Sequence, residues 1–192
     1  MWATRTDWTL LHEEGQPGRS RWLNHATGRP GLWRRNIRTR YSSEMIDSEF
    51  IVWDAPNGEN PARTVSQRSY DAVGRKAKDE WLALFADDAI LEDPAGPSYF
   101  DAEGKGHRGR DAISAFWDTV IAPVKSFRFT VKDSFANGPY CANIATFSTE
   151  MADGTLVDTD LVATYHLDQN GLIDSMRAYW EMERAFATIR QP

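Results

Sequence analysis

Three turn dipeptides place the strongest constraint on how this chain of 192 residues can fold. Asn137-Gly138, Asp153-Gly154 and Asn170-Gly171 each separate two runs that are rich in β-branched and aromatic residues. Dipeptides of this kind favour tight turns between antiparallel strands. Because the runs follow one another, each strand is expected to pair with the next. The second half of the chain is therefore predicted to form an antiparallel meander, with strands at about 127–131, 141–151, 156–167 and 172–182.

The region before the meander carries helical patterns. Apolar residues recur at three- and four-residue spacing up to Phe85, which predicts a helix over 62–86 that Gly74 can divide into two pieces. A short strand at 89–92 follows, and a second helix is predicted over 110–121. Helices followed by a meander indicate the α+β class. The helices are expected to cover the concave face of a curved antiparallel sheet, which leaves a cone with an apolar interior.

The first part of the chain differs in composition from the rest. Residues 1–44 contain eight Arg, no Lys and four acidic residues, whereas the whole chain carries a net charge of −6. Arg interleaved with Trp and without Lys is weak support for nucleic-acid binding, so no nucleic-acid partner is expected. We predict a poorly ordered or atypical extension over residues 1–60, with Met45 as the true initiator, and one domain over 61–188.

The cellular context follows from cysteine and hydropathy. Cys141 is the only cysteine, so an intramolecular disulfide is impossible and a reducing compartment fits. No apolar run approaches the roughly 18 residues that a membrane span requires. The N-terminal residues also lack the apolar segment of a signal peptide. We therefore expect a cytoplasmic protein that does not contact the membrane.

Several kinds of chemistry can be set aside. The four histidines, His12, His25, His107 and His166, show no metal-ligand spacing on one element, so no metal and no cofactor are expected. The glycines of 104-GKGHRGR-110 lack the ending of a phosphate-binding loop. No nucleophile motif is present for covalent catalysis. The remaining possibility is acid–base catalysis by carboxylates and phenols in an apolar cavity.

Three segments together carry a family resemblance. The runs 81-WLALFADDAILEDP-94, 107-HRGRDAISAFW-117 and 168-DQNGLIDSMRAYWEM-182 resemble the ketosteroid isomerase branch of the nuclear transport factor 2-like superfamily, which also includes SnoaL-like polyketide cyclases. The similarity covers about residues 62–186. It implies a cone-shaped, cystatin-like α+β fold and a flat apolar ligand such as a steroid. It also implies a C=C bond moved next to a ketone by carboxylate proton transfer.

The resemblance implies roles for individual residues. In ketosteroid isomerase an Asp base works opposite an oxyanion hole formed by a Tyr and a protonated Asp. Asp93 falls on the base position, and a plain turn former is the alternative interpretation of Asp-Pro. Tyr70 is nearest to the family's Tyr, although it also fits the apolar stripe of its helix. The position of the second donor holds Ala163, which cannot donate, so Tyr165 on the same side of its strand is the candidate replacement.

Further residues are predicted to line the ligand pocket, and each could instead be ordinary core. These are Phe85, Phe116, Trp117, Leu161, Ala163, Met176, Ala178 and Trp180. Alternation along the strand should turn Asp158 and Asp160 away from that pocket. The long segment between Asp93 and Gly109 contains 98-SYFDAEGKG-106, which is interpreted either as a lid or as a plain surface loop.

The favoured function is that of a steroid delta-isomerase-like enzyme. The alternatives are a non-catalytic binder of a steroid or similar apolar molecule, and a SnoaL-like cyclase or dehydratase, because fold alone does not decide function. Family members commonly dimerise through the outer face of the sheet. A homodimer is therefore expected, through a face that carries Ser148, Glu150 and Asp158.

Overall fold

The computed structural model describes residues 8–12, 20–24 and 46–192, which fall into two units divided after Asn36. In the first unit, strand β1 (Trp8–His12) pairs antiparallel with β2 (Ser20–Asn24). The rest of the predicted extension up to residue 45, including Met45, lies outside the described residues. Its assignment as an extension stays a prediction.

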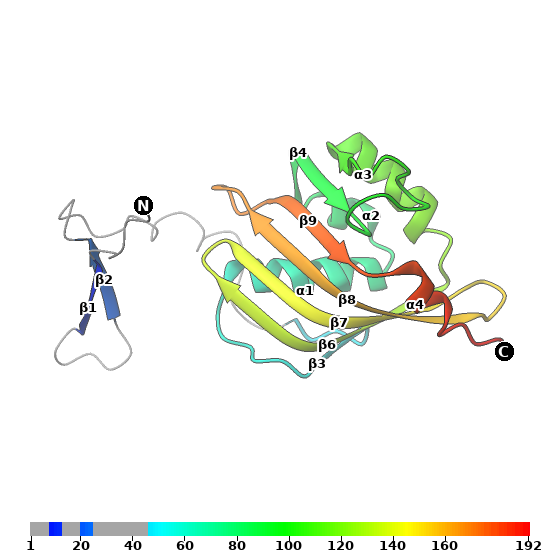
Figure 1. Ribbon diagram of the computed structural model, residues 1–192, viewed down its shortest axis with the longest axis horizontal. Coiled ribbons are helices and arrows are strands. Elements are labelled where there is room, and N and C mark those ends of the chain that lie inside the picture. The colour runs from blue at the N-terminus through cyan, green and yellow to red at the C-terminus, as the bar shows by residue number, and fades with distance from the viewer. Residues whose placement is uncertain (1–7, 13–19, 25–45) are drawn as a thin grey trace, which may run out of the picture. The chain divides into compact units, whose positions relative to one another are not determined.

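The second unit contains all other elements. In chain order they are β3 (Ile51–Trp53), α1 (Pro61–Gly74), α2 (Lys78–Leu82), β4 (Phe85–Glu92), β5 (His107–Arg108), α3 (Arg110–Phe116), the π-helical turn η2 (Trp117–Ile121), β6 (Ser126–Asn137), β7 (Tyr140–Glu150), β8 (Leu156–Leu167), β9 (Ile173–Tyr179) and α4 (Met182–Phe186). Figure 1 shows α1 lying across one face of the curved sheet, with α2 and α3 beside β4.

The sheet has seven strands in the order β3-β6-β7-β8-β9-β4-β5. Strands β6 to β9 form the antiparallel meander, while β3 runs parallel to β6 and β4 runs parallel to β9. The three turn glycines, Gly138, Gly154 and Gly171, have φ of 56°, 85° and 79°, a region that glycine adopts without strain. The predicted meander and the α+β class with a curved, open sheet are confirmed.

Helix α1 brings a buried face onto the sheet. Its N-terminus is capped by Asn60, whose Oδ1 accepts from the backbone N–H of Ala62 at 2.9 Å and of Arg63 at 3.1 Å. The helix packs against β6, β7 and β8. It ends at Gly74, where an added Cβ would lie 2.3 Å from Cγ of Phe50, so only glycine allows that ring to approach. The two ends of α1 are therefore fixed by local contacts, at Asn60 and at Gly74.

Some boundaries differ from the sequence-based predictions. The predicted helix over 62–86 ends at Gly74, resumes as α2, and gives way at Phe85 to β4, so Phe85 belongs to a strand. Strand β3 joins the sheet although it lies inside the predicted extension 1–60. With three residues it is too short for alternation to show. The last strand, predicted over 172–182, ends at Tyr179, and α4 begins at Met182.

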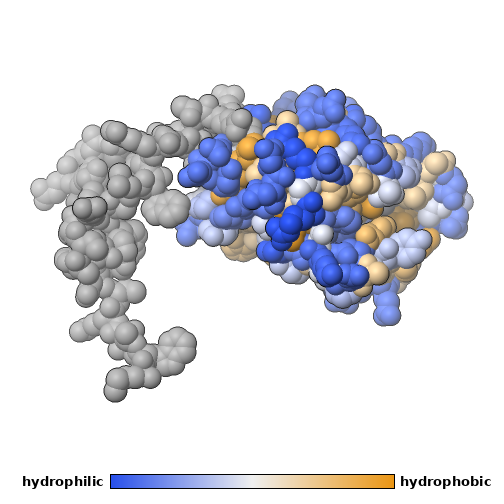
Figure 2. Space-filling view, turned by 90° about the horizontal axis from the view of Figure 1, so that it is seen from above, coloured by the Kyte–Doolittle hydropathy of each residue, from blue (hydrophilic) through white to orange (hydrophobic). Residues whose placement is uncertain are grey.

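Surface hydropathy, helix length and the grouping of potential metal ligands all bear on what the described residues can bind. The face of the second unit in Figure 2 is largely hydrophilic, with smaller hydrophobic areas between the polar residues. Within the described ranges, no helix is long and apolar enough to cross a membrane. The same residues contain no group of three or more His, Cys, Asp or Glu side chains that could hold a metal ion.

Candidate active site

Asp93 lies where β4 ends beside β9. The preceding residue, Glu92, is paired with Arg177 of β9 in the strand register and forms an ion pair with it. Two residues after Asp93, the backbone N–H of Ala95 donates to the carbonyl of Ala178 at 2.7 Å. The Asp93–Pro94 peptide bond between these anchors is cis. The backbone of Asp93 is therefore tied to β9 on both sides.

The Asp93 carboxylate has an aromatic partner. Trp180, directly after β9, donates its indole N–H to Oδ1 of Asp93 at 2.6 Å. Both side chains are partly buried. Burial raises the pKa of Asp93 to about 6, and the hydrogen bond from Trp180 opposes this by favouring the anion. At neutral pH the group is an anion that is more basic than an exposed aspartate, which suits a proton acceptor better than a turn former.

Two tyrosine hydroxyls lie inside the core. Tyr70 comes from α1 and Tyr165 from β8, both are 2% exposed, and their rings meet edge to face with centroids 6.1 Å apart. Tyr70 also stacks on Phe129 at 5.0 Å. Desolvation raises the pKa of each phenol well above its ordinary value, so both are neutral and able to donate. Desolvation is the main cause of the raised pKa of Tyr70, and the charge on Asp93 also raises it.

The two hydroxyls differ in their hydrogen bonding. Tyr70 accepts from Nδ2 of Asn143 on β7 at 3.0 Å. The Tyr165 hydroxyl, in contrast, has no hydrogen bond of normal geometry to any described residue. Tyr70 and Ser69 nevertheless lie close enough to act on its pKa, Tyr70 raising it and Ser69 lowering it. A buried hydroxyl without a well-formed hydrogen bond is only partly compensated for the hydration that it loses. It is therefore available to a ligand oxygen.

Apart from Trp180, which contacts Asp93, the predicted pocket residues separate into two groups. Leu161, Ala163, Met176 and Ala178 are buried on the inner side of β8 and β9, and Ala163 lies opposite Ala178 in the register. Asp160 of β8 is exposed, as alternation predicted. The four small or flexible side chains therefore line the sheet around Tyr165, where they could contact a ligand.

The second group packs elsewhere. Phe85 and Trp117 contact Trp81 at centroid distances of 4.7 Å and 5.2 Å, while Phe116 packs on His107 at 4.9 Å. The first three rings come from α2, β4 and η2, and the second pair joins α3 to β5. Their assignment to the ligand pocket stays a prediction.

Sequence reasoning missed Asn143. It is fully buried on β7 and is the residue that contacts the Tyr70 hydroxyl. Its only local signal is an inward position two residues after Cys141 in an otherwise apolar alternation. An amide at such a position requires buried partners, and this could have singled it out.

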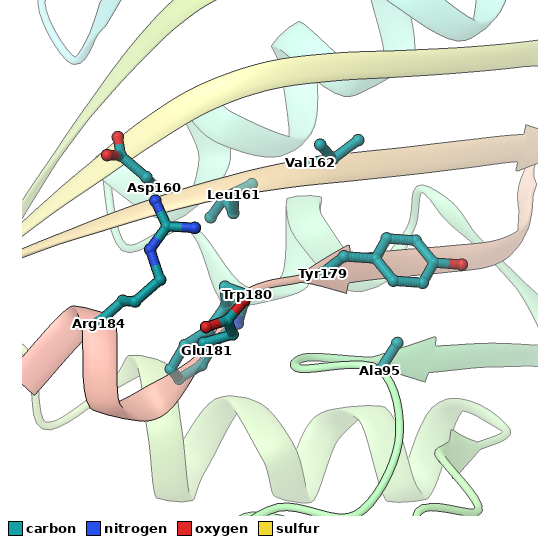
Figure 3. A pocket seen from close by; sticks show the side chains of 8 residues that line it. All are labelled: Ala95, Asp160, Leu161, Val162, Tyr179, Trp180, Glu181 and Arg184. Carbon is teal, nitrogen blue, oxygen red and sulfur yellow. The ribbon is translucent and has the colours of Figure 1, made fainter.

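An open groove of about 410 Å³ adjoins the site from outside (Figure 3). It is lined by Ala95, Asp160, Leu161, Val162, Tyr179, Trp180, Glu181 and Arg184. Figure 3 shows Arg184 directed toward Asp160, whose pKa is lowered mainly by its hydrogen bond to Lys132 and also by the charge on Arg184. Asp93, Tyr70 and Tyr165 are not among the lining residues. Trp180 therefore lines the groove and also contacts Asp93 in the candidate site.

Comparison with known proteins places this geometry in a family. Residues 66–176 match the SnoaL-like domain. The delta 5-3-ketosteroid isomerase from Mycobacterium sp. is 34% identical, with 69% of this chain and 98% of that chain covered and a TM-score of 0.62. A Mycobacterium tuberculosis protein in complex with estradiol-17beta-hemisuccinate is 33% identical, covering 68% and 98%, with a TM-score of 0.61.

A third solved structure is similar to the same degree. A computationally designed 17-OHP binder is 30% identical, with 69% of this chain and 98% of that chain covered and a TM-score of 0.62. Comparison with curated proteins found no match. The chain belongs to the SnoaL-like family of the nuclear transport factor 2-like superfamily, as a ketosteroid isomerase-like member.

Proposed function

We propose that this protein is a steroid delta-isomerase-like enzyme that uses Asp93 as its proton shuttle. The observation that carries the proposal is a partly buried carboxylate at the end of β4, held by a hydrogen bond from Trp180 and with a raised pKa. Similarity to a ketosteroid isomerase and to two steroid-associated structures supports an apolar, steroid-like ligand.

The reaction follows from these groups. Asp93 as an anion removes a proton from the carbon between the ketone and the C=C bond. The electron pair moves through the C–C framework to the carbonyl oxygen and forms a dienolate. Tyr70 and Tyr165 donate hydrogen bonds to that oxygen, in a dry site where such bonds act strongly. Protonated Asp93 then returns the proton two carbons away, which leaves the double bond conjugated with the ketone.

Access to Asp93 requires movement of aromatic side chains in this proposal. The ring of Phe100, from the predicted lid 98–106, lies 6.4 Å from that of Trp180 between centroids. Asp101 secures the segment by accepting from the backbone N–H of Gly104 at 3.1 Å and of Gly106 at 2.6 Å. Segment 98–106 is therefore a compact turn that brings Phe100 beside Trp180, as a lid or as a plain surface loop.

The test of the proposal is conversion of 5-androstene-3,17-dione, followed by the ultraviolet absorbance of the conjugated enone product. Steady growth of that absorbance in proportion to protein concentration supports the isomerase. Ala163 at the position of the family's acidic donor favours a second candidate, a non-catalytic binder. Tight steroid binding without enone formation would support that binder, and a cyclase or dehydratase would give neither result. A cytoplasmic location stays a prediction.

We also propose a homodimer, supported by an exposed apolar row on the outer face of the sheet. Ile144, Val162 and Tyr179 lie side by side in the strand register and are 41%, 37% and 50% exposed. Of the residues first expected to mark this interface, Glu150 pairs with Lys125 and Asp158 with Arg190 in the same chain. The apolar row is therefore the better centre for a contact.

Val162→Glu is expected to convert the dimer to a monomer, because it places a charge in the middle of the apolar row that dimerisation would bury. Light scattering after size-exclusion chromatography measures the mass. Tyr99→Glu is the matched control, since Tyr99 is 86% exposed on the lid and should not affect assembly. A monomeric mass for the unaltered protein at micromolar concentration would contradict the dimer.

A further inference from the structure

A chain of buried polar groups ends at the Tyr70 hydroxyl. Nδ2 of Asn143 donates to that hydroxyl at 3.0 Å and to Oγ of Ser66 at 2.9 Å. On its other side, Oδ1 of Asn143 accepts from the thiol of Cys141 at 3.2 Å. Ser66 in turn donates to the backbone carbonyl of Arg63, one turn back in α1, at 2.8 Å. Asn143 and Ser66 are 0% exposed.

These contacts determine which group donates in each hydrogen bond of this series. The only hydrogen of the Ser66 hydroxyl is used on the Arg63 carbonyl, so toward Asn143 the Ser66 oxygen can only accept. The NH₂ group of the Asn143 amide must therefore face Ser66, and its second hydrogen then reaches the Tyr70 oxygen. Burial raises the pKa of the Cys141 thiol, which keeps it protonated as a donor to the remaining amide oxygen.

The orientation of this amide decides what Tyr70 can do. Were the amide turned by 180°, its oxygen would face Tyr70 and capture the phenolic proton. In the observed orientation Tyr70 accepts from Asn143, so its own proton is not given to the amide. The hydrogen bond from Asn143 also acts against the rise in the pKa of Tyr70 that desolvation causes, which makes the phenol a stronger donor.

We propose that Asn143 is a positioning residue: held by Ser66, its amide keeps the Tyr70 hydroxyl oriented as a donor to the carbonyl oxygen of the ligand. The inference rests on the proposed isomerase function. This role of Asn143 explains how the proposed oxyanion hole, which has Ala163 in place of an acidic donor, can still present a polarised hydroxyl to the ligand. Asn143 does not touch the ligand and acts only through Tyr70.

A test independent of activity uses the ligand-free protein. With tyrosine labelled by ¹³C at the ring carbon that bears the hydroxyl, the Tyr70 resonance is identified by its loss in Tyr70→Phe. We expect this resonance to shift in Asn143→Leu, which removes the donor at similar size, and in Ser66→Ala, which frees the amide to turn. An unmoved resonance in both variants would overturn the inference.

The matched control is Thr64→Val. Thr64 is buried on the same helix, and its hydroxyl likewise donates to a backbone carbonyl, that of Asn60 at 3.2 Å, without contact to Asn143. Like Ser66→Ala, this change removes one hydroxyl. It is expected to leave the Tyr70 resonance in place. Ser66→Ala also keeps the test usable if Asn143→Leu does not fold.

Kinetics separate positioning from structural support. Asn143→Leu and Ser66→Ala are expected to lower kcat for the dione roughly 10- to 100-fold, no more than the loss of one oxyanion donor, with KM changed by less than about twofold. In a Tyr70→Phe background neither change should lower kcat further. Additive losses would overturn the positioning role. If the resonance shifts in the two variants but the wild-type protein forms no enone, the isomerase proposal is wrong. The direction of the hydrogen bonds from Ser66 through Asn143 to Tyr70 would still be supported.

Discussion

Asp93→Asn is expected to lower kcat for isomerisation of 5-androstene-3,17-dione by roughly 10²–10⁴-fold, the usual contribution of a positioned acid–base group. Asparagine cannot accept a proton at neutral pH, yet its Oδ1 can still accept the hydrogen bond that Trp180 gives to Asp93. The steroid should therefore bind about as well as before. Initial rates of enone formation and equilibrium titration with a steroid measure the two effects separately.

Asp88→Asn is the matched control, because Asp88 lies on β4, the strand that Asp93 directly follows, and is exposed. It removes the same charge outside the site and should leave kcat within about twofold of the wild type. Equal activity of the wild type and Asp93→Asn would contradict the assignment of the base. Lost binding together with lost turnover in Asp93→Asn would show that Asp93 holds the ligand instead of moving its proton.

Tyr70→Phe and Tyr165→Phe are each expected to lower kcat roughly 10²–10³-fold, as removal of one oxyanion donor does. Their effects on stability should differ. Tyr70→Phe leaves one Asn143 N–H without its partner and should reduce the free energy of unfolding by about 1–3 kcal/mol. Tyr165→Phe removes a buried hydroxyl that has no hydrogen bond of normal geometry to the described residues, so stability should stay the same or increase.

Thermal and denaturant unfolding of the two tyrosine variants, beside their steady-state kinetics, measures this contrast. A gain in stability with a loss of activity is the signature expected of a group kept for a ligand. If Tyr165→Phe has wild-type kcat, the hole contains Tyr70 alone. If both variants have wild-type kcat, the proposed oxyanion hole is wrong.

Local patterns predicted the meander because its signals are local. Turn dipeptides such as Asn170-Gly171 determine chain reversal over a few residues, and Gly171 has the positive φ that such a turn requires. Strand β3 escaped prediction, since its three residues gain stability from pairing with the distant β6 and not from their own pattern. The parallel pairing of β4 with β9 is likewise a long-range choice. Phe85 continues the helical spacing of the preceding residues, but its pairing with Ile173 of β9 places it in a strand.

The same division applies to the site. Asp93 stood out because proline follows it and a recognisable run precedes it. Its partner Trp180 is 87 residues away, so nothing local indicates their hydrogen bond. Asn143 lies 73 positions from Tyr70 and outside the three segments that carry the family resemblance. Buried polar partners depend on how α1 is seated on β7, which spacing alone does not specify.

The pH dependence of kcat/KM for the wild-type protein with 5-androstene-3,17-dione tests most directly that Asp93 works as a carboxylate in a dry site. Burial raises the pKa of Asp93 to about 6, and only its anion can take the proton. The rate should therefore be constant above that pH, half-maximal near pH 6, and fall about tenfold per unit below it. A rate that stays constant down to pH 4, or no enone at any pH despite steroid binding, would contradict this account.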